Sequence, residues 1–392
     1  MRILATILFL AVMATPAFGI QSPDPPKTYG DFTLAEWRER IKSIPLPVLG
    51  NPQDVHALLE IVSDQDAPWP DRRQAALTLG RIGEPARQAI PVLVDLLRSE
   101  RSQDETTLLW ILKSLTYFQT LAEPAFPDVA KIVSDADRPH LIRVAAMETL
   151  AEIGANHSET LPTLIGVIQS ASEETSADWE LQLAACDALW ILGPNASGAI
   201  PDLLQLARSR WSPLRLSAMQ TIGKVGPAAD IAVAPVVDVV LFDDVGEVRE
   251  AAADALATMG PQGISSLAQL CQDREPEVRL LAIRGLKLSG SPSARLALES
   301  ALSDPDPLVS VQAAAALATL DPSSSPAWEA LIRHLPSEIR RVRLIAYQTL
   351  LRNVDRLEPY AERLREIAES DSAPEQSRSG ARRLYTTHST ER

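Results

Sequence analysis

The stretch that decides the fold is Val248-Arg249-Glu250-Ala251-Ala252-Ala253-Asp254-Ala255-Leu256-Ala257-Thr258-Met259-Gly260. Ala252 and Leu256 are four residues apart, which places them on the same face of a helix. Gly260 can adopt the left-handed conformation at which many helices end. The stretch therefore predicts a helix with a small-residue face and a defined stop.

The same signature recurs nine times along the 392-residue chain. The helix-ending anchors are Gly83, Gln119, Gly154, Gly193, Gly226, Gly260, Gly290, Asp321 and Val354. Eight residues before them stands an Ala column: Ala75, Ile111, Ala146, Ala185, Ala218, Ala252, Ala282, Ala313 and Ala346. Four residues before them stands a Leu column: Leu79, Leu115, Leu150, Leu189, Ile222, Leu256, Leu286, Leu317 and Leu350. Successive anchors are 30 to 39 residues apart, the length of one helical hairpin, so the repeat predicts an α-solenoid.

Four repeats also pair an Asp with an Arg six residues later: Asp66 with Arg72, Asp137 with Arg143, Asp243 with Arg249, and Asp273 with Arg279. This pattern resembles the HEAT-repeat family, which carries Asp in the turn of the hairpin and Val-Arg at the start of the second helix. The short spacing from 246 to 321 is also similar to the HEAT-like repeats of phycobilisome lyases. The resemblance implies an all-α, right-handed solenoid of about nine hairpins, with the second helices on a concave face. It also implies an Asp–Arg ladder between repeats, interrupted at the repeats anchored at Gln119 and Gly193.

The ends of the chain predict segments outside the repeats. Met1-Arg2, an apolar run from Ile3 to Ala14 and Ala17-Phe18-Gly19 are typical of a signal peptide over residues 1–19. A membrane anchor is the alternative, but spanning a bilayer needs roughly 20 apolar residues, and no later segment is long enough. We expect an exported protein, periplasmic or extracellular. Residues 20–32 are expected to form a Pro-rich tether, 33–49 an N-terminal cap helix opened by Thr33 and Glu36, 50–370 the solenoid, and 371–392 a C-terminal cap with a frayed tail.

Charge and composition restrict the partners. The formal net charge is −14, which disfavours nucleic acids and anionic membrane surfaces because both attract Lys and Arg. The five histidines lie on distant repeats without ligand spacing, so we predict no metal and no other cofactor. Cys186 and Cys271 fall on different repeats, too far apart to pair, and are expected to be buried free thiols.

No catalytic motif stands out. The adjacent acids Glu173-Glu174 and Asp243-Asp244 fall in predicted turns, where solvated acids or helix caps are commoner than a glycosidase pair. We therefore predict that the protein is not an enzyme. A hydrolase on a helical toroid is the alternative, and it would need two facing carboxylates in a cavity.

Partner-binding candidates are the second-helix positions that lie two, three or six residues before an anchor, away from the Ala and Leu columns. They are Lys113, Tyr117, Glu148, Glu152, Asp187, Trp190, Lys224, Asp254, Arg284 and Lys287. Trp190 is either an exposed interface anchor or a core residue, whereas Trp110 adjoins Ile111 and is expected in the core. We predict a monomeric scaffold or adaptor that binds a protein or extended peptide on the concave face. The alternative is a lyase-like or chaperone-like accessory protein that handles a bound group or a client.

Overall fold

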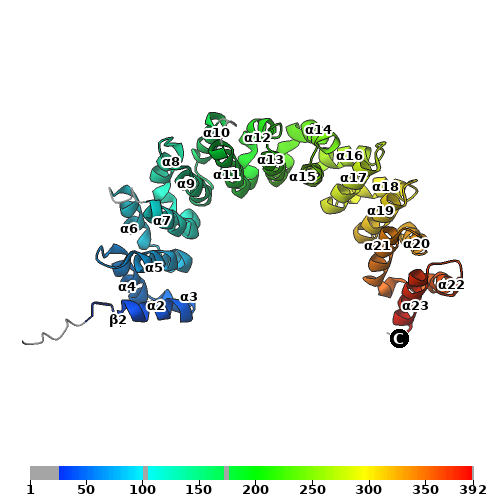
Figure 1. Cartoon of the computed structure of the whole chain (residues 1–392), viewed down its shortest axis with the longest axis horizontal. Helices are drawn as coiled ribbons and strands as arrows, with labels where there is room; N and C mark the ends of the chain where they lie inside the picture. Colours follow the sequence, from blue (N-terminus) through cyan, green and yellow to red (C-terminus); the bar gives the residue numbers. More distant parts are fainter. Residues whose placement is uncertain (1–25, 100–104, 172–175, 391–392) are drawn as a thin grey trace, which may run out of the picture. The chain divides into compact units, whose positions relative to one another are not determined.

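The computed structural model of the chain describes residues 26–99, 105–171 and 176–390 (Figure 1). The predicted signal peptide lies outside these residues. The chain divides into two compact units, unit 1 up to Val92 and unit 2 from Leu93 onward. The boundary falls within helix α6 (Ala89–Arg98).

Unit 1 begins with an antiparallel hairpin of β1 (Thr28–Tyr29) and β2 (Phe32–Thr33). The expectation that residues 20–32 form an unpacked tether is wrong for this part, because Tyr29 is only 3% exposed. Its hydroxyl donates a hydrogen bond to the Asp64 carboxylate, and its carbonyl oxygen accepts one from Trp37 Nε1 at 3.0 Å. The aromatic ring thus fixes this segment against the first repeat despite the neighbouring prolines.

The N-terminal cap consists of two helices, α2 (Leu34–Ser43) and α3 (Leu46–Leu49), where one had been expected over residues 33–49. Pro45 separates them because a proline cannot donate the backbone hydrogen bond that would continue α2. The predicted start of α2 is confirmed. Glu36 N lies 3.4 Å from Thr33 Oγ1, and Thr33 N donates to Glu36 Oε2 at 2.7 Å, which together form a capping box.

Ten helical hairpins follow along the described residues. Their first helices are α4 (Pro52–Ser63), α6, α8 (Phe126–Ser134), α10 (Thr160–Ser170), α12 (Ile200–Leu206), α14 (Val233–Phe242), α16 (Gly260–Leu270), α18 (Arg295–Ala301), α20 (Ser325–His334) and α22 (Ala361–Glu369). Their second helices are α5 (Trp69–Ile82), α7 (Glu105–Phe118), α9 (His140–Ile153), α11 (Ser176–Leu192), α13 (Ser212–Val225), α15 (Gly246–Thr258), α17 (Pro276–Ser289), α19 (Pro307–Leu320), α21 (Arg340–Leu351) and α23 (Glu375–Thr390). Short 3-10 turns join them: η1 (Glu84–Ala86), η3 (Gln119–Ala125), η4 (Gly193–Ala199), η5 (Gly226–Ala232), η6 (Pro292–Ala294), η7 (Val354–Arg356) and η8 (Glu358–Tyr360).

The C-terminal end differs from the prediction. Residues 371–392 were expected to be a cap with a frayed tail from Thr386, but α23 runs to Thr390 and packs against α22 as a further hairpin. Ala381 and Leu384 of α23 are fully buried, which explains why this polar helix is held in place. The solenoid therefore extends one hairpin beyond the nine predicted.

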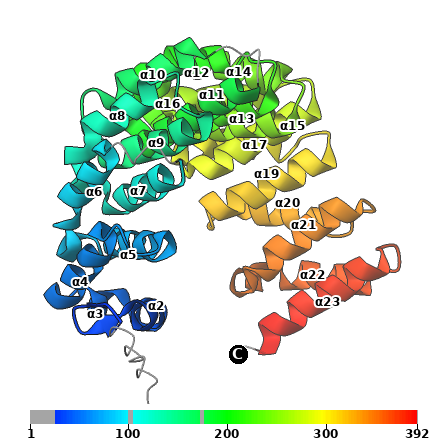
Figure 2. The same ribbon diagram turned by 60° about the vertical axis from the view of Figure 1, so that its left-hand side comes forward.

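The predicted packing seam is confirmed. Every residue of the Ala column and of the Leu column is 0% exposed. In unit 2 each second helix packs against the next, from α7 through α9, α11, α13, α15, α17 and α19 to α21 (Figure 2). Because side chains this small let helix backbones approach closely, the seam gives unit 2 a continuous core.

The helix ends follow the predicted anchors at most repeats. Gly83, Gly193, Gly226, Gly260 and Gly290 have φ between 55° and 77°, and Gln119 adopts φ 52° despite its side chain. Gly154 departs from this, with φ −107°. A Cβ there would lie 2.7 Å from the Phe126 ring and from Thr160 Oγ1, so this position needs glycine for close packing.

The Asp–Arg ladder joins neighbouring hairpins. Arg215 Nε lies 2.7 Å from the Asp243 carboxylate of the next hairpin, and Arg279 Nε lies 2.7 Å from Asp304. Within its own hairpin, Arg279 Nη1 also donates to the Asp273 carbonyl at 2.9 Å. Each of these arginines thus closes its own hairpin turn and holds the next one. The turns at residues 100–104 and 172–175, where the ladder is expected to be interrupted, lie outside the described residues.

The Asp–Arg pattern of the first two turns differs from that of the later ones. Asp66 and Asp137 do not occupy the place of Asp243, because their turns are two residues longer. The turn carboxylates there are Asp64, which accepts a hydrogen bond from Asp66 N at 3.0 Å, and Asp135, which accepts one from Asp137 N at 3.1 Å. Arg72 and Arg143 donate to the carbonyls of Val62 and Val133, each at 3.0 Å.

One stretch, Ser212–Phe242, is long and apolar enough to cross a membrane by length and composition alone, contrary to the expectation that none is. It comprises α13, η5 and α14, with Gly226 at φ 72° between them. Its residues Ala218 and Ile222 belong to the packing seam and are 0% exposed. The apolar character of this stretch is accounted for by the core of two hairpins.

Candidate partner-binding face

In unit 2 the second helices lie on the inner side of the bend (Figure 1). We call the solvent-facing surface of these helices, from α7 to α21, the second-helix face. All ten predicted partner-binding residues belong to these helices. The structure places six of them in the lining of two hollows: Glu148, Asp187 and Trp190 in one, and Asp254, Arg284 and Lys287 in the other.

The central hollow lies between α9, α11 and α13 and has a volume of about 480 Å³. The small side chains of Ala184 and Ala188 line it, and Trp190 forms part of its wall. The Trp190 side chain is 47% exposed, so of the two predictions for this residue the exposed surface position is confirmed and the core position is wrong. The Lys224 ammonium lies 4.5 Å from the centre of the Trp190 ring, a cation–π contact. Trp110, by contrast, is 5% exposed and lies in the core as predicted.

The central hollow is acidic. The charged residues in its lining are the acids Glu148 on α9 and Asp187 on α11. Partial burial raises the pKa of Asp187, and the hydrogen bond that its carboxylate accepts from the Ser217 hydroxyl, at 3.4 Å, only partly offsets this. A carboxylate that is poorly solvated and weakly paired favours a cationic or hydrogen-bond-donating partner.

A second aromatic and lysine pair lies on α7, one helix before the hollow. The Lys113 ammonium is 5.6 Å from the centre of the Tyr117 ring and 2.7 Å from the Glu148 carboxylate on α9. Tyr117 is 43% exposed, and Glu152, one turn beyond Glu148, is half-buried. Residues that are far apart in sequence therefore form one continuous polar and aromatic strip next to the central hollow.

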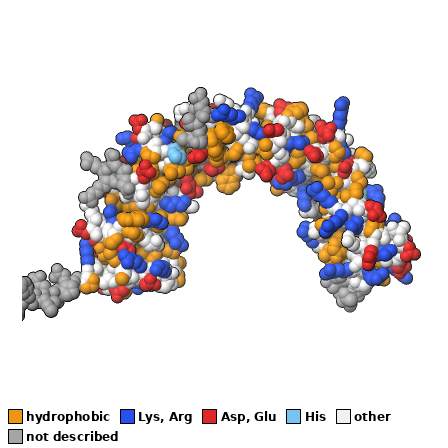
Figure 3. All heavy atoms as spheres, viewed as in Figure 1, with side chains coloured by type: hydrophobic (Ala, Val, Ile, Leu, Met, Phe, Trp, Pro, Cys, Tyr) orange, Lys and Arg blue, Asp and Glu red, His pale blue; other side chains and the backbone are white. Residues whose placement is uncertain are grey.

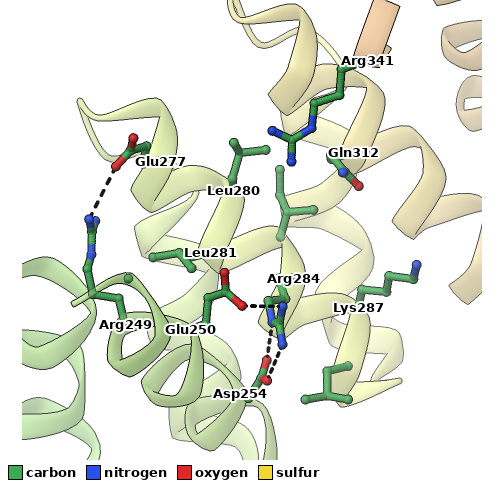
Figure 4. Close-up of a pocket in the computed structure, with 13 residues that line it drawn as sticks. Arg249, Glu250, Asp254, Glu277, Leu280, Leu281, Arg284, Lys287, Gln312 and Arg341 are labelled. Carbon is green, nitrogen blue, oxygen red and sulfur yellow. Dashed lines mark hydrogen bonds and ion pairs between the residues drawn. The ribbon is translucent and has the colours of Figure 1, made fainter. Parts of the chain in front are cut away.

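The C-terminal hollow lies on α15, α17, α19 and α21 and has a volume of about 750 Å³ (Figure 4). Arg284 occupies its centre. The guanidinium donates to both carboxylate oxygens of Asp254 at 2.8 Å and to Glu250 at 2.9 Å, so two acids on α15 share one cation on α17 and a net negative charge remains there. Lys287, the last of the predicted residues, also lines this hollow.

Most other residues of the C-terminal hollow were missed from the sequence, among them Leu280, Gln312 and Arg341. These three lie ten, nine and thirteen residues before their anchors. The prediction used positions two, three and six only. Positions nine or ten and thirteen residues before an anchor lie on the same helix face as position six, one and two turns closer to the start of the second helix. This periodicity could have identified them from the sequence.

The described residues offer binding groups and no reactive constellation. They contain no group of three or more His, Cys, Asp or Glu side chains that could hold a metal. Asp243 and Asp244 both pair with Arg215, while Glu173-Glu174 lies outside the described residues. Cys186 and Cys271 are free and buried as predicted, and burial raises the pKa of each thiol to about 12.

Residues 264–351 match HEAT repeats, and residues 71–99 match the PBS lyase HEAT-like repeat. No curated protein sequence matches the chain. Solved structures with a similar fold include Kap121p, with 14% identity and a TM-score of 0.51 over 89% of this chain and 42% of Kap121p. Kap95p, solved with RanGDP, has 13% identity and a TM-score of 0.51 over 91% of this chain and 61% of Kap95p. The chain thus spans less than two thirds of either karyopherin. The CpcE–CpcF complex of phycocyanin lyase from Nostoc sp. PCC7120 has 23% identity and a TM-score of 0.29, over 40% of this chain and 96% of that one.

Proposed function

Because the chain is a HEAT-repeat solenoid, we propose that it is a non-enzymatic scaffold that binds another protein, or an extended peptide, along the second-helix face of unit 2. The observation that carries this proposal is the placement of both hollows, with exposed aromatic rings beside one of them, on the same face of the stacked second helices. A ready-made concave surface with apolar walls and a few directed charges is the usual form of a recognition site.

Two aromatic anchors support the proposal. Tyr117 is 43% and Trp190 47% exposed, and each ring lies under a lysine ammonium. Large rings contribute much contact area for little loss of side-chain freedom, so residues of this kind dominate the binding energy of many interfaces.

The charge distribution along the face supports a partner bound in one direction. Helix α11 is purely acidic, whereas α21 carries three arginines and no acid. Figure 3 shows Lys and Arg side chains gathered over α17 to α21. Complementary charges set the orientation of a partner more than its affinity. A solenoid of this fold holds a protein in the complex of Kap95p with RanGDP.

Site-specific photo-crosslinking tests the proposal. A photoreactive phenylalanine analogue placed at Trp190 is expected to crosslink a partner in the native compartment. The same analogue at Leu296, which is 77% exposed on the first helix α18, is the control and is expected to crosslink none. Crosslinks confined to Leu296 would contradict the proposed face.

A substitution pair then measures the contribution of the anchor. Trp190→Ala is expected to weaken capture of that crosslinked partner by about tenfold or more, since hot-spot aromatics contribute at least about 2 kcal/mol. Trp69→Ala is the matched control, because Trp69 is 56% exposed but belongs to unit 1. Equal losses for the two variants would show that the ring at Trp190 has no special role.

We also propose that the protein is exported after removal of residues 1–19 and acts as a monomer. Mass spectrometry of the protein from its native cell is expected to give Ile20 as the first residue, and sedimentation to give the mass of one chain. Retention of Met1 in a membrane fraction would indicate an anchor instead.

A lyase-like or chaperone-like accessory role is the second candidate, and the match of residues 71–99 to the PBS lyase HEAT-like repeat favours it. The two buried cysteines argue against covalent handling of a group through a thiol, because a thiol with a pKa of about 12 is not ionised at neutral pH. A spectroscopic titration with a panel of bilins tests this role. Binding at the second-helix face would support it, and a flat response would dismiss it.

A further inference from the structure

We propose that the C-terminal hollow receives an acidic, leucine-bearing segment of the partner protein. This inference rests on the proposed function and names the chemistry of the occupant at one of its two hollows. It is argued from the charges, the unpaired polar groups and the apolar lining of that hollow.

The first observation is a local inversion of charge. The protein as a whole carries −14, yet α17 carries three basic residues against Glu277, α19 carries no charge, and α21 carries three arginines and no acid. Positive charge concentrated on α17 and α21 of an acidic protein is costly unless it is compensated. Part of it is compensated, through Arg279 with Asp304 and through Arg284 with Glu250 and Asp254, but Lys287 and Arg341, which also line the hollow, have no such counter-ion among the described residues.

The second observation concerns the polar groups that line the hollow. Lys287 and Arg341 have no hydrogen bond and no ion pair with any described residue, and neither has the Gln312 amide. Figure 4 shows Arg341 and Lys287 on either side of Gln312. Two free cations can each take a carboxylate, and a side-chain amide can donate to and accept from one peptide group of an extended chain.

The third observation is that the two edges of the hollow differ in the charge that is free to bind a partner. On the α15 edge, Asp254 and Glu250 are bound by Arg284 and leave that edge without free positive charge. The α21 edge has Arg341 and no acid. An acidic segment is therefore attracted to the part between α17 and α21 and repelled from α15, which fixes the strip that it follows.

The fourth observation is apolar. Leu280, Leu281 and Leu288 line the hollow, and Leu288 is 56% exposed. One exposed and two half-buried leucines beside unpaired cations match a segment in which an aliphatic side chain alternates with carboxylates. Burying a leucine side chain of the partner here removes apolar surface from water, and this contribution to binding is not screened by salt as the contribution of exposed charges is.

Selection from a random peptide library against the full chain tests the inference without a known partner. Peptides recovered with the wild type are expected to be rich in Asp, Glu and Leu. The same selection against the Lys287→Glu, Arg341→Glu double variant is expected to lose them. Recovered peptides that are neutral or basic, or that persist with the double variant, would overturn the inference.

Affinities of one recovered acidic peptide then compare matched variants. Arg341→Glu is expected to weaken binding by about tenfold or more, whereas Arg340→Glu, the same change on an exposed neighbour outside the hollow, costs less than about threefold. Leu288→Ser is expected to weaken binding, and Leu296→Ser on α18 is its control. Circular dichroism of each variant ensures that the losses are not losses of fold.

The failure of this inference is distinguishable from failure of the proposed function. If the recovered peptides are basic and are lost on Asp187→Lys, the second-helix face binds peptides but the C-terminal hollow does not take an acidic one. If no peptide is recovered and Trp190 crosslinks no partner, both proposals fail. If single-stranded DNA of equal charge displaces the acidic peptide, the hollow binds any polyanion. That result would also overturn the proposal that the occupant is a leucine-bearing segment.

Discussion

At the scale of single residues, the Ala column sets the distance between second helices. Ala252 is 0% exposed and stands where α15 meets its neighbours α13 and α17. Gly154 shows the same constraint in another form, since a Cβ there would clash with the Phe126 ring. Positions of this kind tolerate no added volume, because close-packed interiors have no room to yield.

We predict that Ala252→Phe lowers the free energy of unfolding by about 1–3 kcal/mol or more, because overpacking forces neighbouring helices apart. Chemical denaturation with urea measures it. Ala234→Phe, the same change on the exposed side of α14, is expected to have an effect within about 0.5 kcal/mol. Equal stability of the two variants would contradict the assigned register.

His334 predicts a pH dependence. Burial and the nearby Arg333 charge lower its pKa below 6.5, and its Nε2 lies 2.8 Å from the Ser310 hydroxyl. Above pH 6.5 the ring is neutral in both the folded and the unfolded chain. Below that pH the unfolded chain takes up the proton more readily, so stability is lost as the pH falls toward the lowered pKa.

We therefore expect that lowering the pH from 8 to 5 reduces the melting temperature of the wild type more than that of the His334→Gln variant. Glutamine can keep a hydrogen bond to Ser310 but does not titrate, and the other histidines cancel in the difference. A difference that does not change with pH would show that His334 is readily protonated in the fold.

At the scale of the elements, the ladder arginines join neighbouring hairpins, whose equivalent positions are about 30 residues apart in the sequence. Arg279 and Asp304 have side-chain exposures of only 10% and 7%, so this pair is shielded from water. Exposed pairs such as Arg365 with Glu369, at 53% and 65%, are surrounded by solvent. The two kinds of ion pair must therefore differ in their effect on stability.

We predict that Arg279→Met lowers the free energy of unfolding by about 3–5 kcal/mol, because it leaves the Asp304 carboxylate buried without its counter-ion. Arg365→Met, the same substitution at an exposed pair, is expected to change it by about 0.5 kcal/mol or less. Denaturation midpoints at constant pH compare them. Similar losses would mean that the ladder pair is solvated.

At the scale of the whole molecule, a solenoid hairpin contacts its neighbours and little else. In unit 2, α15 packs on α13, α14, α16 and α17, and no strong contact links it to α21 or α23. The free energy of unfolding of such an array is close to a sum of contributions from single hairpins and from their interfaces with neighbours. A destabilising substitution is therefore expected to affect only the nearby hairpins.

Hydrogen exchange measured by mass spectrometry checks this. With Ala252→Phe we expect faster exchange in α13, α15 and α17, and unchanged exchange in α22 and α23. A uniform increase over all of unit 2 would indicate that it unfolds as one cooperative block.

The hairpins, their packing seam and most of the helix ends could be predicted from the sequence alone. Ala252, Leu256 and Gly260 are related by spacing within one helix, and helical spacing can be read from a single chain. The same spacing marked Trp190 and Arg284 as surface candidates, although it left open whether Trp190 was exposed. These features depend on interactions that are local or that repeat in the same way at each hairpin.

Tertiary packing, which the sequence does not reveal, determines which of those surface positions form a hollow and which counter-ions their charges have. Lys287 and Arg341 come from helices two repeats apart, and whether a gap remains between them depends on the uncharged helix α19 that lies there. The same holds for Tyr29, whose burial depends on Asp64, 35 residues away. A hollow is a property of several packed side chains at once, and no spacing along one chain encodes it.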